Sequence, residues 1–157
     1  MVIASKYTNV IDSPIGKLGI LTAESKLVKI DFLLASSPLV DSKDPLSSRV
    51  VSSLEGYFSS SKEKFDLPFS LSGTLLQNRI WLLLKKIPVG ETITYGKLAE
   101  KLQTSPRVVG NACRSNPLPI FIPCHRVVGA KDIGGFCGMV AGGKIKIKEW
   151  LLNHEKV

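Results

Sequence analysis

The stretch "TYGKLAEKLQTSPRVVGNACRS", residues 94–115, decides the fold of the second half of the chain. Its first part has apolar residues at the i, i+3, i+4 and i+7 positions of an amphipathic helix, namely Tyr95, Leu98, Ala99 and Leu102. Thr104 or Ser105 can cap a second helix, and Pro106 suits its first position. The stretch therefore predicts two short helices joined by a tight turn, which is a helix-turn-helix.

The second of these helices has two different faces. Arg107, Asn111 and Arg114 recur at i, i+4 and i+7 and form a basic stripe. The other face is apolar and carries Val108, Val109, Ala112 and Cys113. Gly110 lies mid-helix, where glycine costs about 1 kcal/mol relative to alanine. Close internal packing would explain it, but beside a basic stripe we favour close approach of a phosphate backbone or a groove.

The region before this stretch predicts a small α/β lobe. Residues 7–34 contain short apolar runs broken by "SPIG" and "AESK", which predict an antiparallel hairpin or meander. A helix is predicted next by apolar residues at fourfold spacing, Leu46, Val50, Leu54 and Phe58. Residues 59–73 are rich in serine, proline and charge and indicate a linker.

We place the boundary near residue 72 and expect two lobes. Residues 1–72 form an N-terminal α/β lobe with an antiparallel sheet and a helix. Residues 73–157 form a mostly helical C-terminal lobe that contains the helix-turn-helix. In the second lobe, the strongly apolar stretch 74–87 predicts a buried helix.

The bulk composition limits the classes of function. The chain has 157 residues, 44% of them hydrophobic, which suffices for one domain or two small lobes. No apolar run approaches the roughly 20 residues that span a bilayer, and the N-terminus lacks a secretory signal, so we expect a cytoplasmic protein without membrane contact. Lysine and arginine outnumber the acids by 21 to 13. That excess favours a nucleic acid as partner, although solubility alone would also explain it.

The three cysteines lie in the last third of the chain and include no C-x-x-C pair. We therefore expect neither a zinc site nor a structural disulfide, and no metal or cofactor. Cys113 lies on the apolar face of its helix and belongs to the core. Cys137 lies in a glycine-rich loop with nothing nearby to activate it. Cys124 differs because His125 follows it directly, in "IPCHRVVGA" (122–130).

Cys124 is either a nucleophile or a small hydrophobic residue in a buried strand. A free thiol has a pKa near 8.5, so a nucleophilic cysteine needs a base or a positive environment. Neighbouring side chains of an extended chain point to opposite sides, so His125 would act better through a bridging water than directly. The residues alone leave both interpretations open.

Several motifs together resemble one known family, the O6-alkylguanine-DNA alkyltransferases. They are "IPCHRV" (122–127), Asn116–Pro117 before it and "SPRVVG" at 105–110, and the likeness runs from about Trp81 to Glu155. The resemblance implies a small α/β lobe beside a helical lobe with a helix-turn-helix. It also implies direct repair of double-stranded DNA: a guanine alkylated on O6 is flipped out of the duplex, and a cysteine irreversibly takes the alkyl group. Each molecule would act once and without a cofactor. Recognition of one flipped base needs only one copy of the chain, so we expect a monomer.

The resemblance also implies the roles of the catalytic residues. Cys124 matches the alkyl acceptor, and His125 matches the base that acts on it through a water. Glu155 matches the carboxylate that orients the histidine. Asn116 matches the residue that braces the active-site turn. Tyr95 matches the tyrosine that donates a proton to the departing base and contacts the flanking phosphate.

On the recognition helix, Arg107 matches the arginine that enters the base stack and fills the gap left by the flipped base. In this family the helix lies in the minor groove, where small residues permit close approach. This would explain why a glycine stands at position 110. Asn111 and Arg114 complete the DNA-facing stripe. Because damage must be found in any sequence, we expect mostly phosphate and shape contacts.

The loop "IGGFCGMVAGGK", residues 133–144, departs from the family pattern. Many members have a tyrosine in a "GGYSGG"-like loop that walls the pocket. Aligned on "IGG", Phe136 takes that place here, and Cys137 and Gly138 follow it in the pocket wall. Aligned on the later "GG", Val140 takes it instead. We prefer Phe136; either way the tyrosine hydroxyl is missing.

Two other functions remain as hypotheses. One is a DNA-binding protein that recognises alkylated bases without repairing them, which the presence of the acceptor Cys124 disfavours. The other is a cysteine hydrolase that uses Cys124 and His125. Such dyads bring the two residues together from distant segments, so adjacency in the sequence argues against it.

Overall fold

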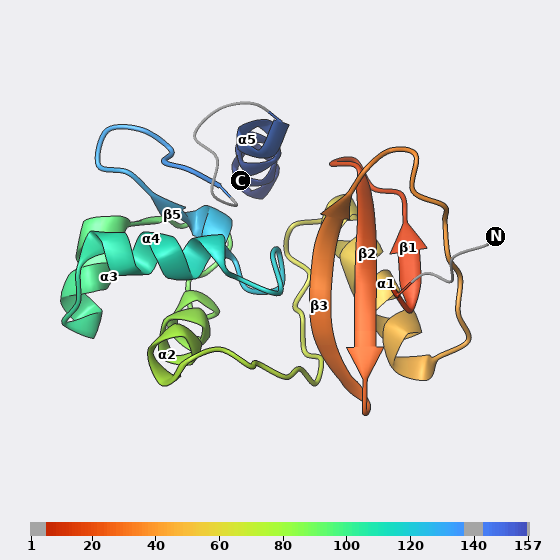
Figure 1. Ribbon diagram of the computed structural model, residues 1–157. Helices are drawn as coiled ribbons and strands as arrows, with labels where there is room; N and C mark the ends of the chain where they lie inside the picture. Colours follow the sequence, from red (N-terminus) through yellow and green to blue (C-terminus); the bar gives the residue numbers. More distant parts are fainter. Residues whose placement is uncertain (1–5, 137–142, 157) are drawn as a thin grey trace. The chain divides into compact units, whose positions relative to one another are not determined.

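The computed structural model describes residues 6–136 and 143–156 (Figure 1). The chain divides into two compact units, residues 1–71 and 72–157. Each unit has its own buried core.

The first unit is a small antiparallel sheet with one helix packed against its strands (Figure 1). Its elements are β1 (Asn9–Ile11), β2 (Lys17–Ala23), β3 (Lys26–Leu33) and α1 (Pro45–Ser59). The "AESK" signal forms the β2–β3 turn, in which Glu24 and Ser25 both have positive φ, as a two-residue hairpin turn requires. The core of this unit is aliphatic with one tyrosine, and includes Val10, Leu18, Ile20, Leu27, Ile30, Val50, Leu54 and Tyr57. The predicted meander and helix are confirmed.

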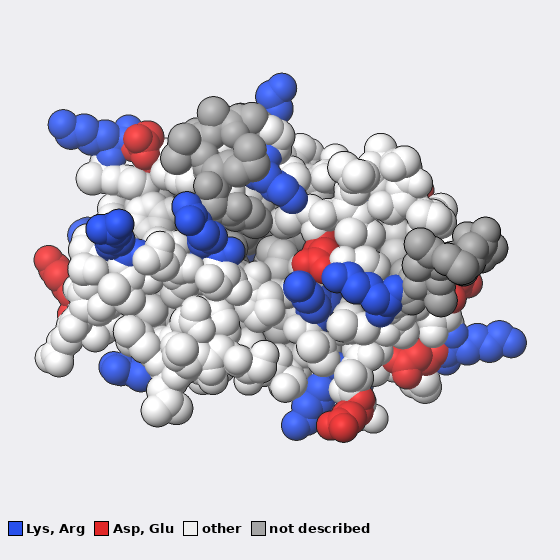
Figure 2. Space-filling view, in the orientation of Figure 1, with Lys and Arg blue, Asp and Glu red and all other residues white. Residues whose placement is uncertain are grey.

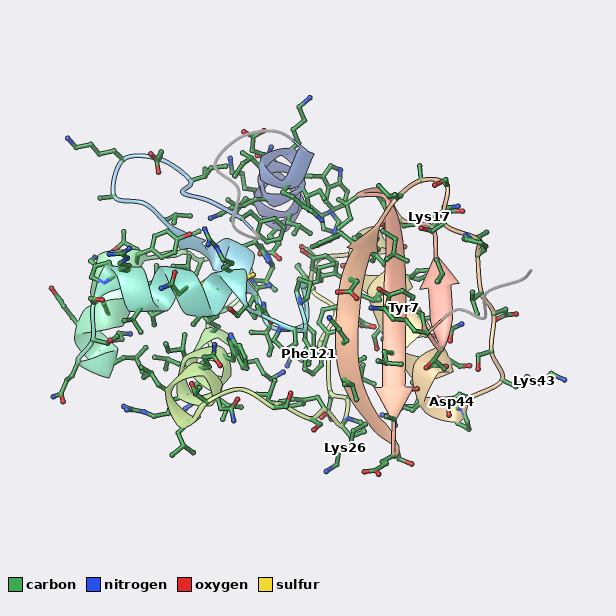
Figure 3. All side chains as sticks on the ribbon, in the orientation of Figure 1. Tyr7, Lys17, Lys26, Lys43, Asp44 and Phe121 are labelled. Atoms are coloured by element: carbon green, nitrogen blue, oxygen red, sulfur yellow. The ribbon has the colours of Figure 1, made fainter. Side chains whose placement is uncertain are left out.

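One carboxylate joins the sheet of this unit to its helix. Asp44, labelled in Figure 3, is the N-cap of α1 and accepts a hydrogen bond from the backbone N–H of Ser47 at 2.9 Å. The same carboxylate accepts a bond from the hydroxyl of Thr22 on β2 at 3.1 Å. A capping side chain thus also fixes where the helix begins relative to the sheet.

The second unit is mostly helical, as predicted. Its helices are α2 (Leu75–Leu84), α3 (Tyr95–Leu102), α4 (Pro106–Arg114) and α5 (Gly143–Glu155). A short parallel pair, β4 (Ile93–Thr94) and β5 (Val127–Val128), joins the start of α3 to the segment after Cys124. The core side chains of this unit come from its four helices, from the segment between α4 and Cys124, and from β5. They include Ile80, Trp81, Leu84, Leu98, Leu102, Val109, Ala112, Leu118, Ile122, Val127 and Leu151.

Helices α3 and α4 form the predicted helix-turn-helix (Figure 1). The side chain of Thr94 caps α3, and that of Ser105, rather than Thr104, caps α4 by accepting from the N–H of Val108 at 3.2 Å. Gln103 ends α3 in the left-handed conformation with φ 54°. The tight turn is therefore built from a C-cap and an N-cap two residues apart.

The prediction that the apolar stretch 74–87 is a buried helix is only half right. Ile80 and Trp81 are buried, and the indole N–H of Trp81 donates to the carbonyl of Ala112 on α4 at 2.8 Å. Leu75 is 89% exposed and Leu82 is 47% exposed. An α-helix has 3.6 residues per turn, so a continuous apolar run places apolar side chains all around the helix. Neighbouring elements cover only one side of it. None of the described helices is both long and apolar enough to cross a membrane.

We expect Ser105→Ala to destabilise the second unit by about 1 kcal/mol, because the N–H of Val108 loses its capping acceptor. Urea unfolding of the full chain measures this change. Ser115→Ala, at the other end of α4, removes an exposed hydroxyl that makes no side-chain cap and serves as the control. Equal midpoints for the two variants would show that the cap does not stabilise α4.

Candidate active site

Cys124 begins a single 3₁₀ turn, Cys124–Arg126, and is not part of an extended strand as considered from the sequence. Its side chain is buried, with 3% of its surface exposed. The N–H of Arg126 donates to the carbonyl of Pro123 at 3.0 Å and closes the turn. Successive side chains of such a turn diverge by about 120°, so the thiol and the imidazole of His125 still point in different directions.

A buried carboxylate holds the two residues that follow Cys124. Glu155, in the last turn of α5, accepts from His125 Nε2 at 2.7 Å and from Arg126 Nε and Nη2 at 2.8 Å and 3.0 Å. His125 and Glu155 are 0% and 1% exposed. Arg126 Nη1 also donates to the carbonyl of Ile87, after α2, at 2.6 Å. The network joins segments from both ends of the unit. His125 and Glu155 are 30 residues apart, so local pattern does not reveal the pair, which only the family resemblance implied.

The state of the imidazole follows from its partners. A carboxylate only accepts hydrogen bonds, so the Nε2 that faces Glu155 carries the proton and Nδ1 keeps its lone pair. Nδ1 is buried and has no hydrogen-bond partner among the described residues. Burial lowers the pKa of His125, helped by the nearby charges of Arg126 and Lys148, and it outweighs the opposing effect of Glu155. His125 is therefore neutral at neutral pH, with a free basic nitrogen.

Asn116 braces the loop that leads to Cys124. Its Nδ2 donates to the carbonyl of Ile122 at 2.8 Å, and its Oδ1 accepts from the N–H of Leu118 at 2.9 Å. Within this loop Ile120 has φ 73°, a left-handed conformation that is strained for a β-branched residue. The strained loop persists because hydrogen bonds hold it on both sides.

Three further polar side chains lie close enough to the Cys124 thiol to couple with it electrostatically. Burial raises the pKa of Tyr95 to about 12, and Cys113 and Cys124 add to this rise. Burial also raises the pKa of the Cys113 thiol far above its usual range. Burial lowers the pKa of Lys148, while Cys124 and Cys113 oppose that shift. The thiol thus lies in an environment with a protonated phenol and a buried lysine.

Lys148 on α5 ties the loop after β5 to the rest of the site. Its Nζ donates to the carbonyls of Val127 at 2.7 Å and Gly135 at 2.8 Å. Tyr95 Oη also points at the carbonyl of Gly135, at 3.4 Å. Phe136, which follows, is 3% exposed. The predicted pocket residues Cys137 and Gly138, and the alternative Val140, lie outside the described residues.

The polar stripe of α4 lies on the surface of the second unit. Arg107, Asn111 and Arg114 are all exposed. A Cβ placed on Gly110 would meet no atom within 4 Å among the described residues. Packing against the described residues therefore does not explain this glycine.

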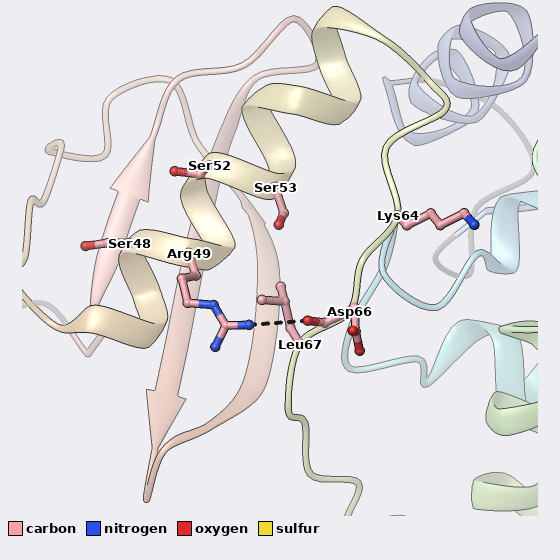
Figure 4. A pocket seen from close by; sticks show the side chains of 7 residues that line it. All are labelled: Ser48, Arg49, Ser52, Ser53, Lys64, Asp66 and Leu67. Atoms are coloured by element: carbon pink, nitrogen blue, oxygen red, sulfur yellow. Dashed lines mark hydrogen bonds between the residues drawn. The ribbon is translucent and has the colours of Figure 1, made fainter.

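Away from Cys124, the described residues form a groove in the first unit. Figure 2 shows lysine and arginine side chains in small separate groups over the face in view. A shallow groove of about 360 Å³ in the first unit is lined by Ser48, Arg49, Ser52, Ser53, Lys64, Asp66 and Leu67 (Figure 4). Its lining contains neither cysteine nor histidine, and Arg49 donates to the carbonyl of Asp66 at 3.4 Å. Among the described residues no group of three or more His, Cys, Asp or Glu side chains could hold a metal.

Sequence reasoning overlooked two residues of this site, Arg126 and Lys148. Arg126 belongs to the motif "IPCHRV", but nothing in the sequence indicates that it binds the same carboxylate as His125. Lys148 could not be recognised either, because "KIKIKEW" (144–150) alternates lysines with isoleucines and nothing distinguishes the buried lysine from the exposed Lys146.

Comparison with known proteins gives consistent matches over both units. Residues 75–157 match the family model described as 6-O-methylguanine DNA methyltransferase, DNA binding domain, and residues 6–71 match the ribonuclease-like domain of the same family. The methylated-DNA–protein-cysteine methyltransferase of Methanosarcina mazei is 38% identical, over 96% of this chain and 97% of its own. The constitutive enzyme of that name from Bacillus subtilis is 33% identical, over 96% of both chains.

Solved structures agree with these matches. The Mycobacterium tuberculosis O6-methylguanine methyltransferase superposes with a TM-score of 0.79 at 36% identity, covering 94% of this chain and 90% of that one. The OGT protein of the same organism in complex with DNA has a TM-score of 0.76 at 38% identity, covering 94% and 91%.

We expect the stability of the protein to fall as the pH drops from 7.5 to 5.5, and His125 to cause about 1 kcal/mol of this loss. The folded state keeps His125 neutral because its pKa is lowered, whereas the unfolded chain binds a proton below about pH 6.5. The contribution of His125 to the free energy of unfolding is therefore fully present above about pH 6.5 and is lost as the pH falls below that value. Urea unfolding at both pH values measures the loss, which His125→Gln should reduce and His154→Gln, on the half-exposed histidine of α5, should not. The same loss in all three proteins would contradict a neutral, buried His125.

Proposed function

The chain belongs to the 6-O-methylguanine DNA methyltransferase family, and on that premise we propose that Cys124 takes the alkyl group from O6-alkylguanine in duplex DNA. The sulfur attacks the alkyl carbon, a C–S bond forms, and the bond from that carbon to O6 breaks. The guanine leaves with the bonding electrons and takes up a proton. The thioether is stable, so each molecule acts once.

The observation that carries this proposal is the buried His125–Glu155 pair beside Cys124. Glu155 fixes the imidazole at 2.7 Å and holds the proton on Nε2. Nδ1, which has no partner among the described residues, can then accept the thiol proton of Cys124. The proton passes through one water, because the two side chains point in different directions. Arg126 keeps the carboxylate in place, and Asn116 braces the loop in front of the cysteine.

Tyr95 serves as the acid for the departing base. Its raised pKa of about 12 keeps the hydroxyl protonated at neutral pH, so that it can donate to the guanine as negative charge develops there. His125 later returns the thiol proton through solvent and restores the phenol. Phe136, which is 3% exposed, takes the place of the pocket-wall tyrosine of many relatives.

The exposed stripe of α4 provides the DNA contacts. Arg107 fills the gap left by the flipped base, and Asn111 and Arg114 contact the backbone beside it. Gly110 lets the helix approach the groove closely, since none of the described residues occupies the space over it. These contacts are to shape and phosphate, which suits a lesion that occurs in any sequence.

The two lobes have different tasks. Residues 73–157 bind DNA and accept the alkyl group, whereas residues 1–72 carry no reaction chemistry. One flipped base needs one copy of the chain, so we infer a monomer. We place the reaction in the cytoplasm, where thiols stay reduced.

Intact-protein mass after incubation with a duplex that contains one O6-methylguanine tests the proposal. We expect one added methyl group per protein, which peptide mapping places on Cys124. Cys124→Ser should gain no methyl, and Cys113→Ser, which changes the other described buried thiol, should still gain one. Unmodified protein bound tightly to an intact lesion would instead indicate recognition without repair. A lesion removed without protein labelling would indicate a turnover enzyme.

Gly110→Ala should change stability and DNA binding in opposite directions. Alanine is the better helix former and its Cβ meets nothing in the free protein, so the free energy of unfolding should rise by up to about 1 kcal/mol. The added methyl should weaken binding to duplex DNA, because it stands between the helix and the groove. Urea unfolding and fluorescence anisotropy with a labelled duplex measure the two effects. Unchanged affinity in the stabilised variant would remove close approach as the reason for this glycine.

A further inference from the structure

The carbonyl oxygen of Gly135 accepts hydrogen bonds from two side chains on different helices. Lys148 of α5 donates from Nζ at 2.8 Å, and Tyr95 at the start of α3 donates from Oη at 3.4 Å. Lys148 also donates to the carbonyl of Val127 on β5, at 2.7 Å. The loop between β5 and Phe136 therefore has one anchor on each helix.

The two anchors differ in strength. Lys148 is fully buried, and its Nζ makes two short hydrogen bonds, at 2.7 Å and 2.8 Å. The bond from Tyr95 is single and near the length limit for a hydrogen bond, at 3.4 Å. The phenol can therefore leave Gly135 at smaller cost than Lys148 can.

The ring of Tyr95 also depends on the position of this loop. Gly134 has φ 71°, and a Cβ on it would lie 2.7 Å from Cε2 of Tyr95 and 3.1 Å from its Oη. The loop backbone thus forms the surface on which the phenol rests. A shift of the loop would move the hydroxyl by a similar amount.

The proposed function makes two demands on one hydroxyl. Tyr95 has a single O–H, which points at Gly135 in the free protein and must point at the guanine during transfer. If this bond were the only hold on the loop, the loop would be released at the moment when the pocket must be in place.

We propose that Lys148 is a positioning residue that holds the 129–136 loop through the carbonyls of Val127 and Gly135, so that the Tyr95 hydroxyl can change acceptor from Gly135 to the guanine without movement of the loop. The proposal rests on the proposed role of Tyr95. Lys148 acts as a hydrogen-bond donor here, since no carboxylate lies within ion-pair distance of it among the described residues. Its hydrogen bonds go to backbone carbonyls, and its Nζ also lies 5.7 Å from the centre of the Tyr95 ring.

A double-mutant cycle on Lys148 and Tyr95 tests the idea. Lys148→Met keeps most of the side-chain volume but removes the donors, Tyr95→Phe removes only the hydroxyl, and Lys146→Met on the exposed side of α5 is the matched control. Hydrogen exchange of the amides of residues 133–136 reports the hold on the loop in the free protein. The methyl-transfer rate and the affinity for unmodified duplex separate pocket geometry from DNA binding.

In the free protein, Tyr95→Phe alone should leave loop exchange within about twofold, because Lys148 still holds Gly135. In the Lys148→Met background the same change should speed exchange by about tenfold or more. Lys148→Met should slow methyl transfer at least about tenfold and leave the affinity for unmodified duplex within about twofold. Lys146→Met should match the unaltered protein in all three measurements.

Two results would overturn the proposal. One is a folded Lys148→Met protein that transfers the methyl group at the original rate. The other is Tyr95→Phe alone releasing the loop. If Lys148→Met does not fold, amide exchange of residues 133–136 in Tyr95→Phe decides. Exchange as slow as in the unaltered protein supports the proposal. Because exchange is measured without DNA, it stands apart from the proposed function, which fails separately if the unaltered protein gains no methyl.

Discussion

The buried carboxylate of Glu155 is the interaction on which the site depends. It accepts three N–H groups, one from His125 and two from Arg126, and it lies at the end of α5, 30 and 29 residues away from them in sequence. A buried charge is tolerated only where it is paired and hydrogen-bonded, and removing one partner of such a pair typically costs about 3–5 kcal/mol. Through Arg126 the same network reaches the carbonyl of Ile87. The helix end, the 3₁₀ turn and the segment after α2 are therefore fixed together.

Burial sets the protonation state of both groups that exchange protons in the proposed reaction. Removal from water lowers the pKa of His125 and raises that of Tyr95. The first is therefore a neutral base and the second a protonated acid at the same pH. One physical cause thus provides both halves of acid–base catalysis, and the neighbouring charges only adjust it.

Stability is given up at two places around this centre. Ile120 has a left-handed conformation in the loop before Cys124, and Gly110 interrupts a helix that would be more stable with alanine. The first is held by the hydrogen bonds of Asn116 and the loop backbone. The second has no compensating contact in the described part of the protein. The strain at Ile120 belongs to the internal geometry of the site, and the proposed contact with DNA would account for the cost at Gly110.

The amino-acid pattern is enough to predict the helix-turn-helix and the polar surface of α4. Local signals suffice there: Ser105 and Pro106 begin the helix, and a 3.6-residue period separates Arg107 from Val109 whatever the helix packs against. The motif around Cys124 also identified the family. The geometry of this motif, and the side chains that hold it in place, depend on contacts between distant segments. The 3₁₀ turn at Cys124, the exposed side of α2 and the burial of Lys148 depend on which distant segments cover each residue. Local periodicity carries no information about such contacts, because they form only when the whole unit closes around its core.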